Sequence, residues 1–117
     1  MRVLICEDNW LIALGLQQIV ADLGHECCGV SNTYDGALQT ASEAGAEVAL
    51  VDLDLADGWT GLRVVDALAE RGTPAIIVSG QAESIDRPHR AVGILSRPVD
   101  VRALAAVLDS VAAGRGG

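Results

Sequence analysis

The sequence contains no lysine, no phenylalanine and no long run of apolar residues. Its longest apolar runs, such as residues 48–51 and 75–78, are far shorter than the roughly 20 residues of a membrane-spanning helix. No basic start is followed by an apolar stretch and a small-residue cleavage site, so no secretory signal is visible. The three cysteines form no CxxC motif, which disfavours a zinc or redox site. These absences predict a cytoplasmic protein with no membrane partner.

Positive charge is also scarce. Eight basic residues, all of them arginine, stand against 16 acidic residues and give a net charge of −8. A protein that binds the phosphate backbone of a nucleic acid needs a basic face, so nucleic acid is not an expected partner. The same excess of acids is compatible with a domain that gathers carboxylates around a metal ion.

The 117 residues suit one domain with its own core, and half of them are apolar. Short apolar runs predict strands at residues 3–6, 26–30, 48–51, 75–78 and 93–95. Apolar residues at helical spacing predict helices at residues 10–23, 33–44, 61–71 and from residue 101 onward. Asn9, Thr60 and Asp100 precede three of these helices as candidate caps. We expect one domain over residues 1–113 and a flexible tail over residues 114–117.

The order of these elements predicts the fold class. Strands and helices alternate along the chain, which is typical of a parallel sheet with helices on both faces. The strands are apolar at consecutive positions, as expected where both faces of a sheet are buried. The segment 81–90 has one large apolar residue, Ile85, and contains Pro88, so a helix there would be short or irregular.

Polar residues follow four of the predicted strands. Just beyond the strand ends lie Glu7, Asp8, Asp52, Asp54, Ser79 and Arg97. In open parallel sheets, ligands bind beyond the carboxyl ends of the strands. Carboxylate oxygens suit Mg²⁺, and a hydroxyl with a guanidinium suits a phosphoryl group. The set therefore indicates half of a phosphoryl-transfer site with a carboxylate nucleophile, although each acid taken singly is more often a helix cap or a solvated loop residue.

These stretches resemble the response-regulator receiver domain of two-component signalling, from Arg2 to about Ala113. The resemblance is carried, in the family's order and spacing, by residues 3–9 (VLICEDN), 50–55 (LVDLDL), 76–80 (IIVSG) and 97–98 (RP). It implies a flavodoxin-like, CheY-like fold: a doubly wound parallel sheet with strand order 2-1-3-4-5 and helices on both faces.

The same resemblance implies roles for the site residues. Asp52 would accept a phosphoryl group from a histidine kinase or phosphotransfer protein, with Ser79 and Arg97 assisting. The ligands of Mg²⁺ would be Glu7 (mostly through water), Asp8, Asp52 and the backbone carbonyl of Asp54. Phosphorylation would switch the binding of a downstream protein whose identity the sequence leaves open. Such a single-domain receiver would at most phosphorylate itself from a phosphodonor and dephosphorylate itself.

Three features depart from the family's pattern. Arg97 replaces the usual lysine, Ile94 stands where many receivers carry an aromatic switch residue, and the stretch between Ser79 and Arg97 is about one helical turn short. One alternative is therefore a pseudo-receiver, a binding module that is not phosphorylated because Arg97 holds Asp52 in a salt bridge. A second alternative, a nucleotide or flavin binder, is disfavoured because no glycine-rich phosphate loop follows the first strand.

Overall fold

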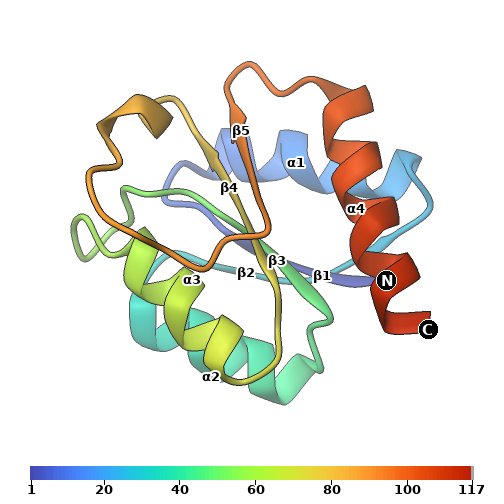
Figure 1. Ribbon diagram of the computed structural model, residues 1–117, viewed down its shortest axis with the longest axis horizontal. Helices are drawn as coiled ribbons and strands as arrows, with labels where there is room; N and C mark the ends of the chain where they lie inside the picture. The colour runs from blue at the N-terminus through green and yellow to red at the C-terminus, as the bar shows by residue number, and fades with distance from the viewer. Residues whose placement is uncertain (117) are drawn as a thin grey trace.

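A computed structural model describes residues 1–116 of the chain (Figure 1). The strands are β1 (Arg2–Cys6), β2 (Glu26–Ser31), β3 (Val48–Val51), β4 (Ala75–Ser79) and β5 (Gly93–Ser96). The helices are α1 (Trp10–Asp22), α2 (Tyr34–Ala44), α3 (Gly61–Glu70) and α4 (Val101–Gly116). A short 3-10 turn, η1 (Ala82–Ser84), lies between β4 and β5. The strands and helices fall close to the predicted ranges.

The strands form one parallel sheet in the order β2-β1-β3-β4-β5. This confirms the predicted flavodoxin-like, CheY-like order. Every residue of β3 and β4 is buried. The unbroken apolar runs in the sequence therefore mark central strands covered on both faces.

Helices cover both faces of the sheet, with α1 and α4 on one side and α2 and α3 on the other (Figure 1). Neighbouring residues in a strand point to opposite faces. Leu50 accordingly packs with Leu16 and Leu108 on the side of α1 and α4. Val51 packs with Leu68 on the side of α2 and α3. Each strand thus contributes to two cores, which fixes the sheet between the helix layers.

Two of the three predicted helix caps are confirmed. Asn9 Oδ1 accepts hydrogen bonds from the first turn of α1, including one of 3.0 Å from the backbone N–H of Leu11. Asp100 Oδ1 accepts a bond of 2.9 Å from the backbone N–H of Arg102 at the start of α4. Each side chain satisfies N–H groups that have no partner inside the helix.

The third candidate, Thr60, occupies the N-cap position of α3, but its side chain does not cap the helix. Thr60 makes no side-chain hydrogen bond to α3. Its hydroxyl instead donates to Asp57 Oδ1 at 2.7 Å, while Asp57 Oδ2 accepts from the backbone N–H of Tyr34 at 3.0 Å. Asp57 therefore ties the loop after β3 to the start of α2, and this nearby loop residue takes the Thr60 hydroxyl away from the helix.

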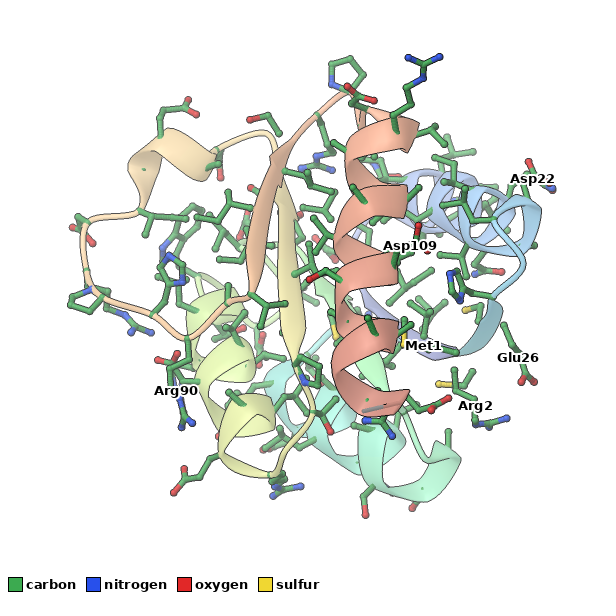
Figure 2. All side chains as sticks on the ribbon, turned by 45° about the vertical axis from the view of Figure 1, so that its right-hand side comes forward. Met1, Arg2, Asp22, Glu26, Arg90 and Asp109 are labelled. Carbon is green, nitrogen blue, oxygen red and sulfur yellow. The ribbon has the colours of Figure 1, made fainter. Side chains whose placement is uncertain are left out.

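The predicted short helix in segment 81–90 is confirmed, because only η1 forms there. Beyond η1 the chain passes beside α3, where Figure 2 shows Arg90. Asp66 of α3 holds this segment with both carboxylate oxygens. Its Oδ2 lies 3.0 Å from Arg87 Nη1, and its Oδ1 accepts a bond of 3.0 Å from the backbone N–H of Arg90.

Asp66→Ala should free this segment. A hydrogen bond to a charged group contributes about 1.5 kcal/mol, so we expect the amide of Arg90 to exchange about tenfold faster in the variant. The measurement is amide hydrogen exchange followed by NMR. Glu70→Ala, one turn further along the same helix, is the matched control and should leave the exchange of Arg90 unchanged. Equal exchange in the two variants would contradict the tether.

The last helix is longer than predicted. α4 continues through Gly116, into the range 114–117 where we predict a flexible tail, and the flexibility itself stays a prediction. Arg115 Nε lies 3.3 Å from Glu47 Oε2 and so links the last turn to the body of the domain. Residue 117, the remainder of that expected tail, lies outside the described residues. The predicted domain boundary at residue 113 stays a prediction.

Across residues 1–116, no helix combines the length and the apolar character that crossing a membrane requires.

Candidate functional site

Four of the predicted site residues meet at the carboxyl edge of the sheet. Glu7, Asp52 and Arg97 directly follow β1, β3 and β5, and Ser79 is the last residue of β4. These strands are neighbours in the sheet, so their ends share one edge. Glu7, Asp52 and Ser79 are 4%, 6% and 1% exposed, respectively. Buried polar groups of this kind need partners, and their partners define the site.

Asp52 is held by one of its carboxylate oxygens. Its Oδ1 accepts a hydrogen bond of 2.8 Å from the backbone N–H of Leu53. Its other oxygen, Oδ2, lies 3.5 Å from Arg97 Nη2. The backbone N–H of Asp52 donates to the carbonyl of Cys6 at 2.9 Å, which fixes the residue to the end of β1. One oxygen is therefore oriented while the other has only a long contact.

Arg97 spans two carboxylates. Its Nη1 lies 3.5 Å from Glu7 Oε2, and its Nη2 lies 3.5 Å from Asp52 Oδ2. Its side chain is 25% exposed. Nη1 is buried and has no hydrogen-bond partner among the described residues. The guanidinium therefore lies between the two acids and forms no short hydrogen bond with Glu7.

Glu7 experiences opposing effects. Burial raises the pKa of Glu7 above its ordinary value, and its Oε1 accepts a bond of 3.0 Å from the backbone N–H of Asn9, which lowers it. The neighbouring charge of Asp52 raises this pKa further, and the charge of Arg97 lowers it. The pKa of Glu7 is raised overall, because desolvation disfavours the charged form and the neighbouring carboxylate of Asp52 adds repulsion.

Ser79 lies at the end of β4 beside Gly80. The hydroxyl oxygen of Ser79 accepts a bond of 3.1 Å from the backbone N–H of Gln81. Gly80 leaves space next to Arg97, because a Cβ built on it would lie 3.7 Å from Arg97 Nη2. Gly80 belongs to the stretch 76–80 that carries the family resemblance, but the sequence analysis assigns it no role.

Asp8 and Asp54 are not part of the buried cluster. Both are exposed. Asp8 lines a cavity of about 260 Å³ together with Glu7 and Trp10, so it lies near the cluster on its solvent side. Asp54 follows the buried Leu53. The predicted role of its backbone carbonyl stays a prediction.

Gly61 is a site residue that the sequence analysis missed. Its backbone N–H donates to the carbonyl of Leu53 at 3.0 Å. A Cβ built on Gly61 would meet the backbone carbonyl oxygen of Asp52 and would lie 2.5 Å from the Cα of Leu53. The start of α3 therefore packs directly on the backbone that carries Asp52. No sequence signal identifies this contact, because glycine here is required by a long-range approach.

The cluster fits Mg²⁺ in its chemistry but not in its arrangement. Carboxylate oxygens are suitable ligands for this ion. Within residues 1–116, however, no group of three or more His, Cys, Asp or Glu side chains is placed to hold a metal. Two of the expected ligands, Glu7 and Asp52, instead face the Arg97 guanidinium.

Comparisons with known proteins identify the family. The family model described as "Response regulator receiver domain" matches residues 3–109. The chain is 35% identical, over 113 residues, to the phyllosphere-induced regulator PhyR of Methylorubrum extorquens. That match covers 92% of this chain and 42% of the relative, so the chain spans less than half of that protein.

Solved structures agree with this match. SdrG from Sphingomonas melonis Fr1 is 29% identical, with a TM-score of 0.80 and 95% of both chains covered. The anti-anti-sigma factor PhyR from Bartonella quintana is 25% identical, with a TM-score of 0.86, covering 98% of this chain and 48% of that one. The sheet order, the residues at its carboxyl edge and the match over residues 3–109 lead to one conclusion: this chain belongs to the response regulator receiver domain family.

Proposed function

We propose that this receiver domain is a phospho-acceptor switch, in which Asp52 takes a phosphoryl group from a phosphohistidine of a histidine kinase or phosphotransfer protein. A carboxylate oxygen of Asp52 attacks phosphorus. The bond from phosphorus to the donor's imidazole nitrogen breaks, and that nitrogen keeps the electron pair and takes a proton. The product is an acyl phosphate on Asp52. In the same way, acetyl phosphate would donate its phosphoryl group and release acetate.

The observation that carries this proposal is the pairing of a buried nucleophile with an unsatisfied donor. Asp52 Oδ2 lies 3.5 Å from Arg97 Nη2 and, within residues 1–116, accepts no shorter hydrogen bond, so it is available for attack. Arg97 Nη1 is buried and forms no hydrogen bond within the part of the chain that the structure describes. An incoming phosphoryl oxygen would satisfy this N–H group, and such charge-assisted bonds are among the stronger ones in proteins. The Ser79 hydroxyl, at the end of the neighbouring strand, is the proposed second contact.

Mg²⁺ is the proposed cofactor, as receiver domains generally depend on it. The proposed ligands are Glu7 (mostly through water), Asp8, Asp52 and the carbonyl of Asp54. When bound, the ion would offset negative charge on the phosphoryl oxygens. The domain's own catalysis would be limited to self-phosphorylation and autodephosphorylation, and we propose that it works in the cytoplasm.

The downstream partner is proposed from the relatives. The Bartonella quintana PhyR is named as an anti-anti-sigma factor, which by this name opposes an anti-sigma factor. We therefore propose an anti-sigma factor as the downstream partner of this chain. This chain spans 48% of that protein, so activities of the rest of that protein are not proposed for this chain.

A second function, the pseudo-receiver, is favoured by one observation. Arg97 already contacts both buried acids, and a permanent contact of this kind would keep Asp52 from reacting. The domain would then bind its partner in a single state. This alternative predicts no phosphorylation from any donor.

Incubation with Mg²⁺ and acetyl phosphate, followed by intact-protein mass spectrometry, separates the two functions. We expect one added phosphoryl group on the wild type and none on Asp52→Asn. Asp54→Asn removes an exposed acid two residues away and is the matched control, which should still gain one group. No added group on the wild type would support the pseudo-receiver, and an added group on Asp52→Asn would place the acceptor elsewhere.

A further inference from the structure

Arg97 lies where a cation is expected, in a pocket formed by the buried carboxylates of Glu7 and Asp52. We infer that Arg97 is the resident cation of this pocket, and that a divalent cation binds only when the guanidinium moves out. The inference deepens the proposed function, because the metal concerned is the one proposed for Asp52. It makes Arg97 a positioning residue that controls access of the metal to the carboxylates.

The charges at the site require a cation. Glu7 and Asp52 are both buried at the carboxyl edge of the sheet, and two like charges placed beside each other repel. Buried charges are costly unless they are paired. Arg97 contacts both acids at the same distance, 3.5 Å, with one nitrogen for each. One guanidinium therefore supplies the positive charge that a bound metal would otherwise supply.

The contacts of Arg97 are loose enough to be exchanged. Charge-assisted bonds between a guanidinium and a carboxylate are usually about 2.7–2.9 Å long. Both contacts of Arg97 are 3.5 Å, and Nη1 is left without a hydrogen bond. A cation held in this way neutralises the acids while keeping few bonds that its departure would break. The geometry fits a displaceable cation better than a permanent lock.

The structure also provides a path for Arg97 to leave. Its side chain is 25% exposed and lines an apolar groove of about 300 Å³ together with Ile12, Ile19 and Pro98. A long side chain can keep its apolar stem on such a wall while its charged head reaches water. Gly80, on the other side, adds no side chain that would confine the guanidinium.

Competition between Arg97 and Mg²⁺ has a measurable consequence. If Mg²⁺ binds only while the Arg97 guanidinium is displaced, the apparent affinity equals the intrinsic affinity multiplied by the fraction of molecules in which it is displaced. A displaced fraction of about 10% therefore lowers the apparent affinity about tenfold. Arg97→Gln, which removes the competing charge, should therefore bind Mg²⁺ about tenfold more tightly. Arg97→Lys keeps the charge but lacks the fork that reaches both acids, so its affinity should lie between those of the wild type and Arg97→Gln.

Isothermal titration calorimetry with Mg²⁺ alone tests this, with Arg87→Gln as the matched control. Arg87 pairs with Asp66 on α3, so its removal changes the net charge equally without touching the pocket. The expected affinities rise in the order wild type and Arg87→Gln together, then Arg97→Lys, then Arg97→Gln. Equal affinities in Arg87→Gln and Arg97→Gln would overturn the inference, as would a lysine variant equal to wild type or no binding of Mg²⁺ to any of them.

A second measurement uses the wild type alone, so it does not depend on whether a variant folds. The Nε–Hε resonance of Arg97 in a ¹⁵N-labelled sample should shift during a Mg²⁺ titration, with the same midpoint as the calorimetric curve. A resonance that stays in place while Mg²⁺ binds would overturn the inference. Neither experiment involves phosphorylation, so a domain that never accepts a phosphoryl group would refute the proposed function and leave this result standing.

Discussion

Arg97→Lys should accept phosphoryl groups from acetyl phosphate about tenfold faster than the wild type, equivalent to about 1.4 kcal/mol in activation free energy. The guanidinium is divided between Glu7 and Asp52 before the reaction. To follow the phosphoryl oxygens it must give up a ground-state contact, whereas a compact ammonium can pair with Asp52 and then turn to the phosphoryl group. Only interactions that strengthen in the transition state accelerate the step.

The rate is measured from the growth of the phosphorylated mass peak at saturating Mg²⁺ and limiting donor. Saturation removes any difference in metal affinity, so the comparison reports on the transfer step alone. Arg97→Gln is the control without a cation, and it should be slower than the wild type because no positive charge then faces the phosphoryl oxygens. An equal or slower rate for Arg97→Lys would show that the arginine is adapted to the reaction.

Gly61→Ala should lower the free energy of unfolding by roughly 3 kcal/mol, near the upper end of the effects of overpacking. The new methyl group would meet the backbone of Asp52 and Leu53, which cannot rotate away as a flexible side chain could. Either α3 or the end of β3 must shift. Because that backbone carries Asp52, the variant should also lose phosphorylation.

Urea unfolding with linear extrapolation measures this change. Gly15→Ala is the matched control, since a Cβ at Gly15 in α1 would meet nothing within 4 Å. Alanine in a helix interior is favoured over glycine, so this control should gain about 0.5–1 kcal/mol. A Gly61→Ala protein as stable as the wild type would show that α3 does not pack against Asp52 as described.

The features that could be predicted are those that depend on residues close together in the sequence. The apolar runs of β3 and β4 mark them as central strands, because both faces of these strands are buried. Asn9 and Asp100 cap their helices through neighbours two residues away. The convergence of Glu7, Asp52, Ser79 and Arg97 follows from the rule that parallel strands end at one edge, once the family resemblance supplies the strand order.

The features that could not be predicted depend on which of several possible partners a side chain meets in the folded domain. Thr60 fits a cap pattern, but Asp57 takes its hydroxyl. The pseudo-receiver alternative pairs Arg97 with Asp52, and the second contact of Arg97, with Glu7, depends on how β1 and β5 are spaced across the sheet. The extension of α4 to Gly116 likewise involves the contact between Arg115 and Glu47.

The most direct test of the account is to identify the phosphorylated residue. After incubation with Mg²⁺ and acetyl phosphate, sodium borohydride reduces an aspartyl phosphate to homoserine, which peptide mass spectrometry locates. The account predicts homoserine at position 52 in the treated protein, and unmodified aspartate at that position when the phosphodonor is omitted. Homoserine at Asp8 or Asp54, or at no position, would contradict the assignment of Asp52 as the phospho-acceptor.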